Sequence, residues 1–395
     1  MKRILVEFYS EDMSENLVSL LQEAYDGVVF VYFAKEKKPT RLTRARLKET
    51  LQKHFGFAPS FLPIGVCNLE TTLSAFSRLP KSNRYDFDLT GGNEIFIAAA
   101  GFFAAREKNR SIFLHQYHVK SGKKIFSYPE NTFSQEFFPT YLSAPEILSL
   151  EGAIPISLPR YPSGNEALRE EILRLWTALT PARRDWNAFC SIPIADGVFR
   201  DPQTEGARAL GREPRFHRAW RAVTARLEQA NIIQNCRTVE ENGQSIGIFQ
   251  WNLAPEARFL WEKAGNLLEY YSALAADESG IFHDIRVGSL LDWNGSTAPP
   301  RQPDPKNEID LILMHRNLPV FASCKNTVPH NDYLYEILTM TRHFGGLSAT
   351  PMLIATEKAS FALRQRAREM GILLLDDVGK NSTEALAERF RRLFP

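Results

Sequence analysis

The sequence contains little cysteine and no long apolar run, and both absences narrow what the protein can be. Its 395 residues include only four cysteines, scattered without a C-x-x-C pair. A reduced cytoplasm therefore fits better than a secreted disulfide framework, and a structural zinc site is not expected. No stretch of about 18 apolar residues occurs, so we expect no membrane-spanning helix and no membrane partner.

The sequence also lacks a strong net charge, a dinucleotide-binding fingerprint and internal repeats. The formal net charge is +2 at pH 7, so any basic surface must be local. No G-x-G-x-x-G follows the first strand-like segment, which argues against a dinucleotide-dependent enzyme. The 44% hydrophobic and 24% charged composition is that of a soluble globular protein, and the length predicts two or three domains.

Residues 1–145 alternate between strand-like and helical patterns. Short apolar runs rich in strand formers, such as Ile4–Tyr9 and Gly27–Phe33, are each followed by a segment with helical spacing. Strands that alternate with helices of about 10–15 residues indicate a mostly parallel, doubly wound sheet. The chain is therefore expected to begin with an α/β, Rossmann-like domain that senses a ligand.

Two loops of this domain hold candidate ligand-binding residues. Ser10–Asp12 follows the first strand, and Thr90–Glu94 follows the fourth, where a helix begins. In a Rossmann-type sheet these strands are neighbours, and ligands bind in the crevice beyond their C-terminal ends. Paired glycines let a phosphate approach the backbone, and a helix N-terminus offers it unpaired N–H groups. The residues expected to line this pocket are Ser10, Glu11, Thr90, Gly91, Gly92 and Asn93.

Residues 146–254 are expected to form a linker and a winged-helix-like segment. Glu166–Leu179 and Phe216–Ala230 have helical spacing, and Gln234–Trp251 is strand-like on both sides of Asn242-Gly243. Asn-Gly between two such runs is a strong hairpin signal. Helices followed by a hairpin suggest a winged helix-turn-helix. Its last helix carries Arg215, Arg218, Arg221 and Arg226.

Residues 255–395 carry acidic residues and a lysine in a pattern typical of phosphodiester hydrolysis. Glu308 and Asp310 alternate on one strand-like run, and Ser323 and Lys325 alternate on the next. Because side chains alternate faces along a strand, adjacent antiparallel strands can bring Asp310 and Lys325 to one sheet edge. Carboxylates can hold a divalent cation that polarises a phosphoryl group, and an ammonium can orient the attacking water or steady the developing charge.

This C-terminal region resembles the PD-(D/E)xK nucleases, in the motif and in its order of helix, three strands, helix and strand. The resemblance implies that Asp310 is a metal ligand, that Lys325 is the catalytic lysine, and that Glu269 is the acidic residue of the preceding helix. It also implies a divalent metal, Mn²⁺ or Mg²⁺, held by Glu269, Asp310 and Glu308.

Ser323 is a departure from that family, which usually has an acidic residue two positions before the lysine. A hydroxyl is a poor metal ligand beside a carboxylate. Either Glu269, Glu308 or Glu336 supplies the missing charge, or metal binding is weak, or the site is inactive. We count Ser323 among the catalytic-site residues because of its position.

The N-terminal motif Asp88–Glu94, together with the Ser10-Glu11 loop, resembles the CARF domain, the CRISPR-associated Rossmann fold. A CARF domain, a winged-helix-like segment and a PD-(D/E)xK domain together resemble the ancillary nucleases of type III CRISPR systems. This resemblance implies a homodimer whose two CARF domains share one pocket for a cyclic oligoadenylate, most often cyclic tetra-adenylate. It also implies nuclease domains that cut DNA or RNA with little sequence preference once this messenger binds.

Two alternatives remain open at this point. A CARF-linked, metal-independent ribonuclease of the HEPN type would use an Arg-x4–6-His motif. That motif occurs as Arg110…His115 and Arg212…His217, but outside the helical setting that this family requires. A ligand-responsive transcription factor would instead use the arginine-bearing helix to bind DNA and keep an inactive nuclease fold as a dimer scaffold.

Overall fold

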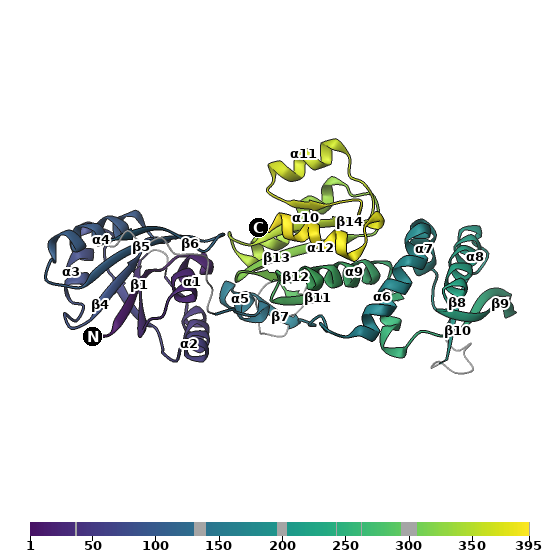
Figure 1. Ribbon diagram of the computed structural model, residues 1–395, viewed down its shortest axis with the longest axis horizontal. Helices are drawn as coiled ribbons and strands as arrows, with labels where there is room; N and C mark the ends of the chain where they lie inside the picture. Colours follow the sequence, from purple (N-terminus) through teal and green to yellow (C-terminus); the bar gives the residue numbers. More distant parts are fainter. Residues whose placement is uncertain are drawn as a thin grey trace.

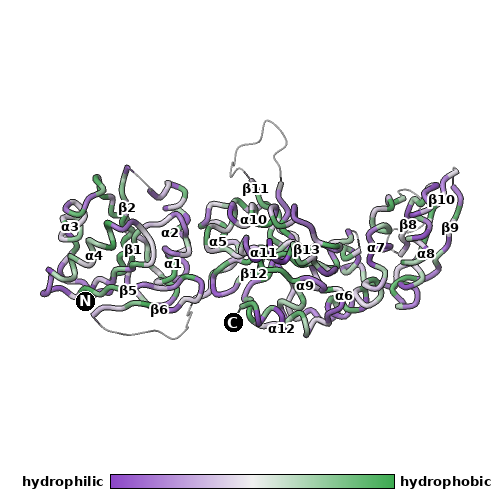
Figure 2. The backbone as a smooth tube through the Cα atoms, turned by 90° about the horizontal axis from the view of Figure 1, so that it is seen from above, coloured by the Kyte–Doolittle hydropathy of each residue, from purple (hydrophilic) through white to green (hydrophobic). Residues whose placement is uncertain are grey.

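Three β-sheets follow one another along the long axis of the molecule (Figure 1). The computed structural model describes residues 1–35, 38–129, 140–195, 204–241, 243–261, 263–293 and 306–394. Seen from above, the N-terminal sheet lies at one end, the C-terminal sheet in the middle, and the smallest sheet at the far end (Figure 2). None of the helices within these ranges is long and apolar enough to cross a membrane.

The first sheet is the predicted Rossmann-like unit, with strand order β3-β2-β1-β4-β5-β6. Its strands are β1 (Arg3–Phe8), β2 (Gly27–Phe33), β3 (Ser60–Ile64), β4 (Arg84–Asp88), β5 (Ile112–His118) and β6 (Lys123–Tyr128). The first five are parallel, and β6 runs antiparallel to β5. Its helices are α1 (Met13–Gln22), α2 (Arg41–Phe55), α3 (Leu69–Ser77) and α4 (Glu94–Arg106).

Alternation along β1 explains why this sheet is covered on both faces. Val6 and Phe8 enter one apolar cluster with Phe96 of α4, whereas Leu5 enters another cluster with Leu17 of α1. A strand that is buried on both faces has to be apolar at nearly every position, as β1 and β2 are. The exceptions on β1 are Arg3 at its start and Glu7, which is fully buried.

The second sheet has the order β15-β14-β13-β12-β11-β7 and carries the candidate nuclease residues. Its strands are β7 (Ile154–Ser157), β11 (Asp284–Asp292), β12 (Lys306–His315), β13 (Leu318–Lys325), β14 (Thr350–Ala355) and β15 (Leu373–Leu375). Its helices are α5 (Ala144–Glu151), α9 (Ala264–Ser279), α10 (Asn331–Gly345), α11 (Phe361–Glu369) and α12 (Thr383–Leu393), with a 3-10 turn at Val378–Lys380.

The third sheet is antiparallel, has the order β8-β10-β9, and is covered by helices. The elements of this extension are α6 (Glu166–Leu179), a 3-10 turn at Thr180–Ala182, α7 (Arg183–Cys190), β8 (Glu205–Ala209), α8 (Pro214–Gln229), β9 (Ile233–Glu241), β10 (Gln244–Trp251) and a 3-10 segment at Pro255–Trp261. The predicted hairpin is present as β9 and β10, although Asn242 lies outside the described residues.

Strand β7 lies within residues 146–254, the range expected to hold the linker and winged-helix-like segment. It pairs with β11 and so extends the sheet of the C-terminal unit. The division of the chain at residues 145 and 254 remains a prediction, and β7 is a strand that precedes residue 254 but belongs to the sheet of the C-terminal unit.

Candidate functional site

A cavity of about 270 Å³ lies beyond the C-terminal ends of β1, β2 and β4. The residues around it are Tyr9, Ser10, Tyr32, Phe33, Gly92, Asn93, Glu94 and Phe96. Three of the residues predicted for this pocket, Ser10, Gly92 and Asn93, are therefore in its wall. Their binding roles remain predictions. The aromatic residues of the wall were not foreseen, because each ends an apolar strand or sits in an apolar helix and has the spacing of a core residue.

The glycine loop packs closely against the first strand and first helix. Gly92 has a φ of +90°, and a Cβ placed there would lie 2.4 Å from the Cβ of Phe8. A Cβ on Gly91 would lie 2.8 Å from Oε2 of Glu15 on α1. Gly92 therefore requires glycine, both for this contact with Phe8 and for its backbone conformation, whereas a side chain at Gly91 would have to displace the Glu15 carboxylate. Gly91 is thus used for packing against α1.

Asp88, at the end of β4, fixes the start of this loop. One carboxylate oxygen accepts hydrogen bonds from Thr90, through its N–H at 2.8 Å and through its hydroxyl. The other accepts a hydrogen bond from Ser19 of α1, whose hydroxyl lies 3.0 Å from Nε2 of His115. The Thr90 side chain is thereby turned into the protein. It positions the pocket loop and does not form part of the cavity wall.

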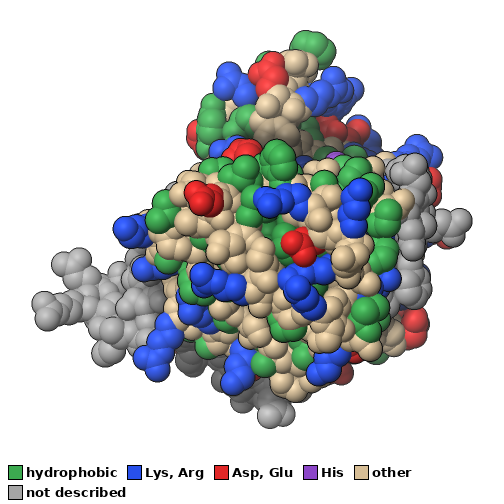
Figure 3. All heavy atoms as spheres, turned by 90° about the vertical axis from the view of Figure 1, so that its left-hand side faces the viewer, with side chains coloured by type: hydrophobic (Ala, Val, Ile, Leu, Met, Phe, Trp, Pro, Cys, Tyr) green, Lys and Arg blue, Asp and Glu red, His purple; other side chains and the backbone are tan. Residues whose placement is uncertain are grey.

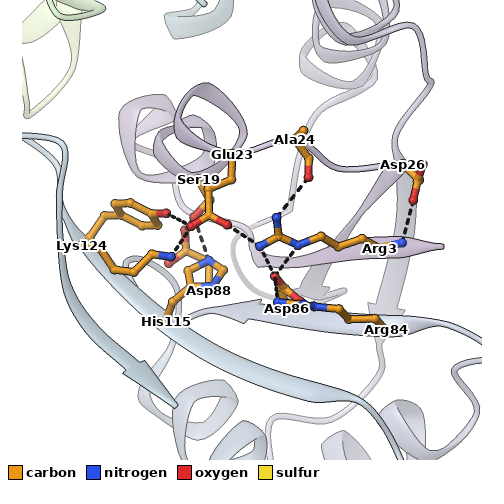
Figure 4. Close-up of polar contacts among 11 residues, drawn as sticks. Arg3, Ser19, Glu23, Ala24, Asp26, Arg84, Asp86, Asp88, His115 and Lys124 are labelled. Atoms are coloured by element: carbon orange, nitrogen blue, oxygen red, sulfur yellow. Dashed lines mark hydrogen bonds and ion pairs between the residues drawn. The ribbon is translucent and has the colours of Figure 1, made fainter. Parts of the chain in front are cut away.

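A second buried network ties α1 to the sheet in the same region. Arg3 donates hydrogen bonds to Asp86 and to Glu23, as Figure 4 shows. Burial would raise the pKa of Glu23, but hydrogen bonds from Lys124, Tyr117 and Arg3 lower it to about 2. Glu23, Asp86 and Asp88 thus have compensating donors, which is the usual condition for a charge that serves structure. Glu7 of β1 is the exception, because burial and the charges of Asp88 and Glu15 raise its pKa.

The C-terminal site lies in a fork between two strands. β12 and β13 are paired from His315↔Leu318 to Leu311↔Ala322 and then separate, β12 staying with β11 and β13 with β14. Asp310 occupies the fork, where its Oδ2 accepts hydrogen bonds from the backbone N–H of Cys324 at 2.6 Å and from the Ser323 hydroxyl at 3.2 Å. The Asp310 carboxylate therefore accepts the hydrogen bond from the Cys324 N–H at the point where the backbone pairing of β12 and β13 has ended.

Lys325, the last residue of β13, projects toward α10. Its Nζ lies 4.9 Å from the centre of the Tyr333 ring and 3.9 Å from Oε2 of Glu336. Its side chain is 22% exposed, so the ammonium sits at the edge of the site rather than in bulk solvent. Cation–π contact and a long ion pair hold it there without a short hydrogen bond to a carboxylate. The lysine is therefore positioned but remains available to a ligand.

Glu269 of α9 completes a group of neighbouring acids. Burial, together with the charges of Asp310 and Glu308, raises the pKa of Glu269 to about 8, against the opposing effects of Lys263 and Lys325. Burial also raises the pKa of Asp310, which the Cys324 N–H, Lys325 and Ser323 lower in part. Gly265, one turn earlier, leaves room for Glu269, because a Cβ there would lie 3.0 Å from Oε1.

The donor set suits a hard divalent cation, which prefers carboxylate oxygens and relieves repulsion between them. Glu269, which is buried, is influenced by Asp310, which is half-buried, whereas Glu308 is 47% exposed and lies 3.6 Å from Lys263. Within the residues that the structure describes, no three acidic, histidine or cysteine side chains already surround one point. Ser323 serves as a hydrogen-bond donor to Asp310, and Glu336 faces Lys325.

The two Arg-x4–6-His pairs are not arranged as a ribonuclease site. His115 is 2% exposed on a central strand and bonded to Ser19, and Arg110 donates to the carbonyl oxygens of Ser77 and Leu79. His217 lies in the first turn of α8 with Nε2 3.0 Å from the carbonyl oxygen of Gly211. Neither histidine faces an arginine across a cleft, so the metal-independent reading gains no support.

Helix α5 and the loop after α10 connect the pocket to the second unit. Asp12, which caps α1 two residues after Ser10, accepts a hydrogen bond from Ser348 at 2.8 Å. Burial, together with the Asp12 charge, raises the pKa of Glu151 in α5 to about 8, and a Cβ on Gly346 would lie 2.7 Å from its Oε2. The loop after β1 therefore contacts the loop that follows α10, and Tyr333 lies near the opposite end of that helix.

Two solved structures share this fold over nearly their whole length. Protein VC1899 from Vibrio cholerae matches with a TM-score of 0.72 and 17% identity, over 99% of this chain and 98% of that chain. Can2 from Sulfobacillus thermosulfidooxidans, solved in complex with cyclic tetra-adenylate, matches with a TM-score of 0.65 and 13% identity, over 100% and 99%. No protein-family model and no curated protein matches the sequence. The resemblance to the CRISPR ancillary nucleases is thus confirmed in the fold.

Proposed function

We propose that this chain is a metal-dependent nuclease of type III CRISPR defence that is activated by a cyclic oligoadenylate. The observation that carries the proposal is the fork between β12 and β13, which groups Asp310, Glu269 and Lys325. A buried pair of acids beside an ammonium is costly for stability and is typical of a site that handles phosphate charge. The fold shared with Can2, which was solved with cyclic tetra-adenylate, supports the activator.

The residues of the fork would have different roles in phosphodiester hydrolysis. Glu269 and Asp310 would hold a divalent cation, Mn²⁺ or Mg²⁺, with Glu308 able to approach from the strand edge. When bound, such a cation polarises a phosphoryl oxygen and lowers the pKa of a bound water. Lys325 would orient the attacking water or steady the developing negative charge. Ser323 would hold the Asp310 carboxylate in place through the hydrogen bond it donates.

The activator would bind at the N-terminal cavity of a homodimer. Helix α4 begins beside Gly92 and Asn93. The Asn93 side chain caps the Ile95 N–H, and the positive end of the helix dipole at this point suits a phosphate. Tyr32 and Phe33 offer aromatic surface for adenine rings. A messenger that binds one arrangement of the two chains more tightly than another can shift their equilibrium, and that difference in affinity is its only means of activation.

A cleavage assay tests the proposal directly. The substrates are labelled single-stranded RNA, labelled single-stranded DNA and supercoiled plasmid, each with Mn²⁺ or Mg²⁺ and with or without cyclic tetra-adenylate. We expect cleavage only with both the metal and the messenger, little sequence preference, and no cleavage in EDTA. Lys325→Ala is the matched inactive variant. Cleavage that persists in EDTA would refute the metal site, and cleavage that ignores the messenger would refute the activation.

A further inference from the structure

The face of helix α8 that points away from the protein is strongly basic. The buried side of α8 consists of Ala219, Trp220, Val223, Thr224 and Leu227. At 100° per residue, the opposite side carries four exposed arginines. These are Arg215, Arg218, Arg221 and Arg226. We call them the α8 arginine face.

The charges of this face are poorly neutralised. Arg215 is 67% exposed and its nearest acid, Glu213, lies 3.8 Å away, and Arg218 is 73% exposed with Asp185 at 3.4 Å. The one acidic residue within α8, Glu228, accepts a hydrogen bond from Cys236 of β9 and so faces the sheet. Four exposed arginines on one side of a helix, with only the long ion pairs to Glu213 and Asp185 beside them in the described residues, fit a phosphate backbone in charge.

Helix α7 joins this face to the catalytic edge. Its Asp185 contacts Arg218 of α8, and its Asn187 exchanges two hydrogen bonds of 2.8 Å with Asn326. Asn326 directly follows Lys325. In Figure 1, α7 lies between α8 and the C-terminal unit. Stacking of Phe189 on Trp220, with ring centres 5.9 Å apart, fixes α7 against α8.

We propose that the α8 arginine face binds the phosphate backbone of the nucleic acid and presents it to the site at Lys325. This inference rests on the proposed nuclease function and adds the surface that grips the substrate. Phosphate contacts position a nucleic acid without reading its sequence, which agrees with a nuclease of low sequence preference. The helix thereby serves substrate binding, in addition to connecting the third sheet to the rest of the chain.

The test measures binding separately from cleavage. Full-length protein in EDTA, without activator, is titrated with fluorescent single-stranded DNA and RNA across a range of salt concentrations. The variant is Arg215→Gln/Arg221→Gln/Arg226→Gln, which changes only exposed side chains. We expect affinity for both probes to fall at least about tenfold, and the slope of log K against log salt to become shallower by about 2, since each phosphate contact contributes about 0.7.

A matched variant controls for charge alone. The distal end of the N-terminal unit also bears scattered Lys and Arg side chains (Figure 3). The control variant, Arg78→Gln/Lys81→Gln/Lys108→Gln, removes the same charge from exposed positions of that unit. An equal loss of binding in the control, or unchanged binding in the α8 variant, would overturn the proposal. So would a change in oligomeric state on gel filtration, because the face would then be an interface between copies. If wild type binds in this titration but does not cleave in the separate assay with metal and messenger, the nuclease proposal fails instead.

Discussion

Both six-stranded sheets hold carboxylates that are withdrawn from solvent, but the surroundings of Asp88 and Glu23 differ from those of Glu269 and Asp310. Below the pocket, Asp88 has donors for both carboxylate oxygens, and the basic side chains of Arg3 and Lys124 offset Glu23. In the fork of the second sheet, burial and the charges of neighbouring acids raise the pKa of Glu269 to about 8. Burial also raises the pKa of Asp310. The donors around Asp88 and Glu23 satisfy these two carboxylates, whereas Glu269 and Asp310 repel each other and would gain from a cation.

The difference arises from how each strand ends. Parallel strands β1 and β4 stop together, so their acids lie inside the sheet and only the following loops reach the pocket. β12 and β13 separate before they end, and the gap lets side chains from two strands and a helix converge. A pocket formed by loops can close around a large ligand. A fork within a sheet holds a few charges rigidly, as catalysis requires.

The largest effect is expected from Asp310→Asn, which removes the charge from the fork. Cleavage should fall on the order of 10³-fold or more, because a cation loses its central ligand. Thermal stability should stay equal or rise, since a repelled buried charge disappears. Single-turnover cleavage and a melting curve measure both. Asp332→Asn, at a 91% exposed side chain near the site, is the control and should change neither. A fully active Asp310→Asn variant would mean that the site is misassigned.

Much of this comparison could be predicted from the sequence. Alternating and helical patterns depend on nearby residues only. The expected strands and helices of the first unit, and the strands around Asp310 and Lys325, therefore agree closely with the observed elements. Both Gly-Gly and the strand-end motifs depend on residues within a few positions of each other. The two loops of the pocket could be paired because neighbouring strands of a Rossmann sheet end at one edge.

Other features depended on contacts between distant residues. The spacing of residues 256–276 favours one long helix, but Trp261 packs in an aromatic cluster with Trp186 and Trp251, and the next helix, α9, begins at Ala264. β7 has only four residues, includes a proline, and is defined by its partner β11. The separation of β12 and β13 could not be predicted from the sequence, because register between strands is set by tertiary packing and not by the spacing of Asp310 and Lys325.

The next largest effect is expected from Gly92→Val, which changes the glycine loop of the N-terminal pocket. Gly92→Val would place side-chain atoms against Phe8 in a backbone conformation that valine avoids. We expect affinity for cyclic tetra-adenylate, measured by calorimetry, to fall by roughly 100-fold or about 3 kcal/mol. Gly101→Ala, in the exposed part of α4 with no atom within 4 Å of the new Cβ, should leave binding intact. Equal affinities for wild type and Gly92→Val would remove this loop from the pocket.

Asp88→Asn is the counterpart of Asp310→Asn in the first sheet and should act in the opposite direction on stability. The amide cannot accept at both positions, so bonds from Thr90 and Ser19 are lost or inverted. The free energy of unfolding should fall by about 1–3 kcal/mol, the usual effect of a disrupted buried hydrogen-bond network. Chemical denaturation measures it. If both variants changed stability in the same direction, the contrast between structural and functional acids would not hold.

The smallest effect concerns Glu151, which lies where the two units meet. Its pKa is raised to about 8 in the folded protein by burial and by Asp12, while an unfolded glutamate has a pKa of about 4.5. The folded state therefore holds a proton that the unfolded state releases, and this contribution to stability is lost as the pH rises from about 4.5 to about 8. Tyr9 also faces this carboxyl.

Glu151→Gln keeps the shape of this contact and removes its titration. The variant should lose less thermal stability than wild type between pH 5 and pH 8, and the two melting curves should approach each other at the acidic end, where the wild-type residue is protonated. Glu384→Gln, on the surface of α12, is the control and should follow the wild-type pH profile. Parallel profiles for wild type and Glu151→Gln would show that the Asp12–Glu151 pair is solvated. The pocket loop would then lack its buried contact with α5.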